Sequence, residues 1–114
     1  MKFEELRKFI TQDMSMSHIY QPVMLIELLK NDGSASEEDI AKVILNRDPT
    51  QLEYYIDKVK NMVGVVLAKR LVTTKDKAIH RLNGYAELTQ EQRCELINLC
   101  MDKLIQYEDE LLSI

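Results

Sequence analysis

Apolar residues recur at intervals of three and four over most of the chain, which is the spacing of helices that bury one side. The first segment that shows this pattern, residues 1–14, does so through Phe3, Leu6, Phe9 and Ile10. The next run, PVMLIELLK, is apolar around most of its circumference and ends at Asn31-Asp32-Gly33, a common C-terminal helix signal. We therefore expect an amphipathic first helix and a centrally buried second one.

Two further helices are predicted by their starting residues. Ser36, with Asp39 three positions later, fits a capped start for a third helix. Asp48 followed by Pro49 fits the start of a fourth. The inward stripe of the fourth helix is predicted to be Leu52, Tyr55, Ile56, Val59, Val63 and Val66, and Gly64 is a point of bending or close approach.

Beyond Arg70 the pattern changes from helical to alternating, which predicts a β-hairpin. Residues 71–74 are expected to pair with 78–82, although the turn lacks the glycine of the strongest hairpin signals. A long final helix then covers residues 88–112, and Thr89 with Gln92 forms its capping box.

These elements predict a mainly α fold with a small β-hairpin in a single domain, 1–114. Three helices followed by a hairpin is the order of a winged helix-turn-helix. Residues 22–82 would form its core and 71–82 its wing, with the N-terminal helix 1–14 and the long C-terminal helix 88–112 added.

The charge of the chain is divided unevenly. The net charge is -4, yet residues 57–81 hold seven Lys or Arg against two Asp, a local balance of +5 that leaves -9 for the remainder. A basic face on an otherwise acidic protein suits contact with DNA. The alternative is that these lysines are ordinary solvent-exposed charges on a helix and a hairpin.

Residues on this segment are candidates for DNA contact if the fourth helix lies in a major groove. Base contacts are predicted for Thr50, Gln51 and Tyr54, because glutamine can pair with adenine and hydroxyls offer hydrogen bonds. His80 and Arg81 are candidates for the minor groove. Alternatively, Gln51 is only a cap and Tyr54 an edge-of-core residue. Backbone contacts are predicted for Lys58, Lys60, Lys69, Arg70, Lys75, Lys77 and Arg81.

The final helix carries more apolar circumference than one core needs. Leu104 and Leu111 are therefore candidates for an interface with a second copy of the chain or with an attached effector domain. The alternative is that the first helix covers this surplus. The C-terminal third, residues 83–114, carries -5 and is expected to avoid DNA.

Other functions find little support. No glycine-rich phosphate loop, nucleophile motif or metal-ligand spacing occurs, so we expect no enzyme activity, cofactor or metal. Cys94 and Cys100 are spaced too far apart along one helix for a disulfide, and both are expected to be buried. No apolar run reaches the roughly 18 residues of a membrane span, so a cytoplasmic protein without membrane partners is expected.

Five segments resemble a prokaryotic N-terminal module that precedes HNH nuclease domains, some with a histidine-triad domain: FEELRKFI, MSHIYQPVMLIELL, ASEEDIAKVIL, QLEYYIDKVKNMVGVVLAKR and LTQEQRCELINLC. The resemblance implies a winged-helix unit that targets an attached effector to double-stranded DNA in restriction or phage defence. Because some such domains recognise methylated adenine, it also implies methylation-sensitive binding. No HNH or HIT residues precede Ile114, so an excised domain or a protein acting alone is expected.

Overall fold

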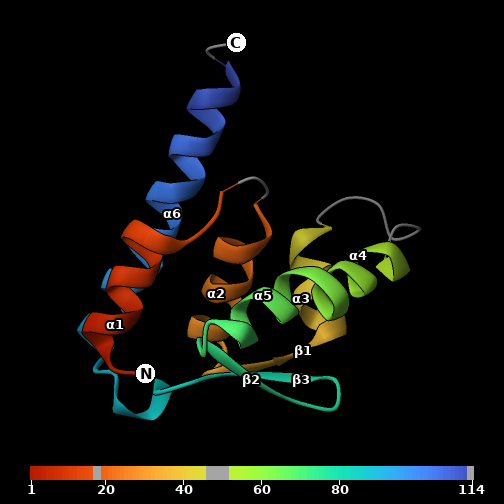
Figure 1. The fold of residues 1–114 in the computed structure, drawn as a ribbon, viewed down its shortest axis with the longest axis horizontal. Coiled ribbons are helices and arrows are strands. Elements are labelled where there is room, and N and C mark those ends of the chain that lie inside the picture. The colour runs from red at the N-terminus through yellow and green to blue at the C-terminus, as the bar shows by residue number, and fades with distance from the viewer. Residues whose placement is uncertain (17–18, 46–51, 113–114) are drawn as a thin grey trace.

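A computed structural model describes residues 1–16, 19–45 and 52–112 (Figure 1). It is mainly helical with one small antiparallel sheet, as predicted. Its elements in chain order are α1 (Phe3–Lys8), η1 (Phe9–Asp13), α2 (Tyr20–Lys30), β1 (Ser34–Ser36), α3 (Glu37–Ile44), α4 (Leu52–Lys58), η3 (Val59–Val63), α5 (Gly64–Lys69), β2 (Thr73–Asp76), β3 (Ile79–Leu82), η4 (Tyr85–Glu87) and α6 (Gln90–Leu112).

α2 is the central helix, and it contacts α6 on one side and α3, η3 and β3 on others. α1 and η1 also pack on α6 (Figure 1). The C-terminal half of α6 extends beyond the other helices (Figure 1). The prediction of a buried second helix is confirmed by its buried residues, which are Pro22, Met24, Leu25, Leu28 and Leu29.

The predicted hairpin is confirmed, with its strands shifted along the chain. β2 pairs with β3 from Thr73 opposite Leu82 to Asp76 opposite Ile79, and Lys77 takes the left-handed conformation (φ 57°) in the turn. β1 pairs with the other edge of β3, giving the strand order β1-β3-β2. Sequence reasoning missed β1 because three residues, Ser-Ala-Ser, are too short for an alternating pattern.

The helix that contains α4, η3 and α5 is interrupted by a π segment over Val59–Val63. Its hydrogen bonds span five residues instead of four, so the residues after it are rotated relative to a regular helix. As a result Leu67 is fully buried while Val66 is 39% exposed. The predicted inward stripe is therefore wrong at Val66, and Leu67 takes that place.

Two of the predicted helix starts are confirmed by their side-chain hydrogen bonds. The Asp39 backbone N–H donates to Ser36 Oγ at 3.1 Å. At α6, Thr89 and Gln92 each accept a backbone hydrogen bond from the other, at 2.9 and 3.1 Å. The predicted cap at Asp48 and Pro49 lies outside the described residues.

Among the described residues, no helix has both the length and the apolar character to span a bilayer.

Candidate nucleic-acid interface

Tyr54 lies on the outer side of α4 with half of its surface, 51%, exposed. Its ring meets that of Tyr55 edge to face, with the centroids 5.2 Å apart. The Lys58 ammonium lies 5.1 Å from the centroid of the Tyr54 ring, within the range of a cation–π contact. The outer side of α4 therefore presents an aromatic ring and a positive charge together. The other two predicted base contacts, Thr50 and Gln51, lie outside the described residues.

Further exposed cations lie on the rest of this helix and in the turn of the hairpin. Lys60 and Lys69 are exposed on η3 and α5, and Lys77 is exposed in the hairpin turn. Within the described part of the chain, none of these lysines has a carboxylate within 4.0 Å. We call Lys58, Lys60, Lys69 and Lys77 the basic surface.

Two predicted backbone contacts instead pair within the protein. The Arg70 guanidinium lies 3.4 Å from the Asp13 carboxylate and 5.4 Å from the centroid of the Phe9 ring, which connects α5 to η1. Lys75 Nζ lies 3.2 Å from Glu37 Oε2. Both cations are partly neutralised by these carboxylates, so they attract a phosphate less strongly than an unpaired lysine would.

His80 is buried at 1% exposure, and the prediction that it faces a minor groove is wrong. Successive side chains of a strand point to opposite faces, and β3 turns His80 and Leu82 inward. His80 Nε2 lies 3.0 Å from Glu37 Oε2. Its ring packs on Gly64, where an added Cβ would lie 2.7 Å from His80 Cε1. Sequence reasoning treated Glu37 as a helix-start acid and missed this pair.

Arg81 lies on the other face of the sheet. It follows His80 in β3, is exposed, and is opposite Thr74 on one side and Ser34 on the other. It lines an open hollow of about 460 Å³ together with Tyr85 and Asp32. Lys75 pairs with His80 and therefore lies on the same face of the sheet as His80. Arg81 lies on the opposite face, so the two cations are on different sides of the sheet.

Tyrosines from three helices meet at the start of α2. The rings of Tyr20 and Tyr55 pack edge to face with centroids 6.4 Å apart, and Tyr107 of α6 lines the same hollow of about 230 Å³, with Ile19 and Ile44. Burial raises the pKa of Tyr20, and the neighbouring Tyr54, Tyr55 and Tyr107 raise it further. Sequence reasoning missed this cluster because its members are far apart along the chain.

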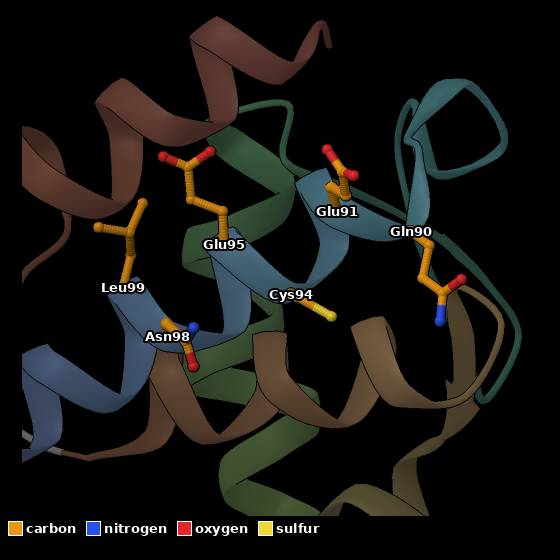
Figure 2. Close-up of a pocket in the computed structure, with 6 residues that line it drawn as sticks. All are labelled: Gln90, Glu91, Cys94, Glu95, Asn98 and Leu99. Carbon is orange, nitrogen blue, oxygen red and sulfur yellow. The ribbon is translucent and has the colours of Figure 1, made fainter.

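A third hollow lies along the first half of α6 and has a volume of about 550 Å³ (Figure 2). Cys94 lines it and is exposed, so the prediction that both cysteines are buried is wrong for Cys94. Cys100 is buried, and burial raises the pKa of its thiol to about 12. Both thiols are free.

The second half of α6 exposes apolar side chains. Met101 is 48% and Ile105 54% exposed, and Leu104 is half-buried. Leu111 belongs to the same helix, but its side chain lies outside the described part of the structure. α1 and η1 therefore do not cover all of the apolar surplus that the sequence indicated.

No family model, curated protein or solved structure matches this chain. The resemblance to the module that precedes HNH nuclease domains stays a prediction.

Proposed function

We propose that the chain is a double-stranded DNA-binding module of the winged helix-turn-helix class. In this proposal the outer side of α4 enters the major groove, and the turn of the hairpin contacts the phosphate backbone. The observation that carries it is the basic surface, whose lysines have no carboxylate partner among the described residues. One of them, Lys58, lies over the exposed Tyr54 ring. When unpaired lysines bind phosphates, the counterions condensed on the DNA are released, and this release drives association.

The order of elements also supports this class. α2, α3 and the long helix from α4 to α5 precede the hairpin, which extends toward the same edge of the view as the start of α4 (Figure 1). A two-helix unit with an exposed second helix is the arrangement that fits a major groove.

The predicted residues then take different roles. Tyr54, with Thr50 and Gln51, would meet base edges, whereas the basic surface would hold phosphates and set the register. Arg70 and Lys75 would contribute less, because Asp13 and Glu37 already pair with them. Arg81 would reach a phosphate only from the outer face of the sheet. An attached or associated nuclease-type effector would supply catalysis, and adenine methylation would alter the affinity.

The test is the affinity of purified variants for a labelled duplex of about 20 base pairs at low salt, measured by fluorescence anisotropy. Lys60→Ala should weaken binding to every sequence alike and reduce the salt dependence by about one phosphate contact. Tyr54→Ala and Gln51→Ala should instead change the preference among sequences. Lys42→Ala is the matched control, because Lys42 lies on α3 and pairs with Glu38 at 3.4 Å. Equal effects of Lys60→Ala and Lys42→Ala would contradict the proposed surface.

A second candidate function is a protein-interaction or dimerisation module that uses α6. The exposed Met101 and Ile105 on the projecting half of this helix favour it. Sedimentation should then show a dimer that Leu104→Glu or Leu111→Glu dissociates while DNA binding is retained. A monomer at all protein concentrations would reject dimerisation.

A further inference from the structure

We propose that the second half of α6 binds the outer side of α5 on a second copy of the chain, so that copies associate head to tail. Each copy exposes one surface that is apolar and acidic, on α6, and another that is apolar and basic, on α5. This inference goes beyond the proposed function and does not depend on DNA binding. It also differs from a symmetric dimer, in which α6 would meet α6.

The apolar part of the α6 surface consists of Met101 and Ile105, which are four residues apart and 48% and 54% exposed. Because residues three or four apart are neighbours on a helix, the exposed Asp102, Glu108 and Asp109 border Ile105. None of these three carboxylates has a cation within 4.0 Å among the described residues. This half of α6 extends beyond the other helices, so another molecule can lie along it (Figure 1).

The outer side of α5 exposes two valines shortly after the π segment, Val65 at 40% and Val66 at 39%. Lys69 follows them by four and three residues, so it lies beside both on the helix surface. Its ammonium has no carboxylate within 4.0 Å in the described part of the chain. π segments often occur at functional sites, and this one turns Val66 outward. α5 therefore offers an apolar surface together with an unpaired positive charge.

Charge decides which of these surfaces fits which. Residues 57–81 carry +5 and residues 83–114 carry -5, so α5 of one copy and α6 of another attract each other. Two α6 helices side by side would instead bring their carboxylates together, which disfavours a symmetric contact. Contact between α5 and α6 covers the exposed apolar side chains of both helices and places Lys69 against the acids of α6.

A contact of this kind uses different surfaces on the two copies. Each associated pair keeps one free α5 surface and one free α6 surface, so further copies can add in a ring or a filament. In the DNA complex proposed above, phosphates would take Lys69. A duplex and a second copy would then compete for α5.

The test uses two variants that each remove one surface. Sedimentation velocity of the intact chain, from low micromolar to near-millimolar concentration, should show association that weakens as salt is added. Lys69→Glu should weaken it by more than about tenfold, because a carboxylate then faces the acids of α6. Ile105→Glu should do the same, because it places a charge in the apolar contact. The matched controls are Lys77→Glu and Gln106→Glu, which make the same changes of charge at exposed positions outside the two surfaces and should have little effect.

An equimolar mixture of the two variants gives the sharpest result. Lys69→Glu keeps an intact α6 surface and Ile105→Glu keeps an intact α5 surface, so the mixture should form a complex with one copy of each. An intact chain that is monomeric at every concentration would overturn the proposal. So would association that survives in Lys69→Glu, which would indicate contact between two α6 helices, or a mixture that forms no complex.

These measurements contain no DNA, so their failure is distinguishable from failure of the proposed function. Circular dichroism confirms that each variant is folded, and Met101→Glu replaces Ile105→Glu if the latter is not.

Discussion

Glu37 connects two parts of the protein through a single carboxylate. It begins α3, and its Oε2 lies 3.0 Å from His80 Nε2 and 3.2 Å from Lys75 Nζ, both on the hairpin. A buried carboxylate is tolerated when such partners replace its lost water. The position of the hairpin relative to α3 is therefore held by polar contacts as well as by the pairing of β1 with β3.

Gly64 is required where α5 begins, because the His80 ring occupies the space of a side chain. In a regular helix Gly→Ala is favourable by up to about 1 kcal/mol. Here the new Cβ would lie 2.5 Å from the Val59 carbonyl oxygen and 2.7 Å from His80 Cε1. We expect Gly64→Ala to reduce the free energy of unfolding by about 1–3 kcal/mol, as overpacking does. Urea denaturation measures this free energy. The control is Val65→Ala, because Val65 is exposed and its substitution should change the free energy of unfolding by less than about 0.5 kcal/mol. A stabilised Gly64→Ala protein would contradict the packing described.

The two thiols should differ in reactivity. The thiolate is the reactive form, and the pKa of Cys100 is raised to about 12 by burial, so this thiol stays protonated and covered. Iodoacetamide at about pH 8 should modify the exposed Cys94 and spare Cys100 until the protein is unfolded in urea. Mass spectrometry of tryptic peptides counts the modified sites. Equal rates at both cysteines in the folded protein would show that α6 is packed differently.

Among the elements, the π segment has the largest effect on which residues face the core. The spacing of apolar residues predicted the helix from Leu52 onward and the burial of Val59 and Val63 in it. It could not find the change of phase after Val63, because a π turn has no side-chain pattern of its own.

This change of phase predicts unequal effects of two neighbouring substitutions. Leu67 is fully buried, so Leu67→Ala should lower the free energy of unfolding by about 2–5 kcal/mol. Val66 is 39% exposed, so Val66→Ala should change it by less than about 1 kcal/mol. Urea denaturation of both variants measures the difference. A larger loss of stability in Val66→Ala than in Leu67→Ala would contradict the π segment and favour the regular helix that the sequence alone predicts.

The local sequence specified most elements of this fold and little of its site. Periodicity located the amphipathic helices, and capping residues such as Ser36 and Thr89 located two of their starts. The local sequence did not predict contacts between distant segments. Glu37 and His80 are 43 residues apart, and the meeting of Tyr20 with Tyr107 depends on how α2 packs on α6. Such contacts follow from tertiary packing, which no local pattern encodes.

At the scale of the whole molecule, charge is separated by element. The segment from Asp57 to Arg81 has a balance of +5, and residues 83–114 carry -5. The basic segment forms the helix end and hairpin, and the acidic one forms mainly α6, whose C-terminal half projects away from the hairpin (Figure 1). In the DNA complex that we propose, this separation of charge would turn α6 away from the polyanion.

The most direct test of DNA binding is the salt dependence of the affinity of the intact chain for a short duplex. Four lysines of the basic surface that contact phosphates should give a slope of about -3 to -4 in log K against log salt concentration. Anisotropy titrations at several salt concentrations measure this slope. A slope near zero, or no binding at micromolar protein in low salt, would contradict the proposal that this surface binds DNA.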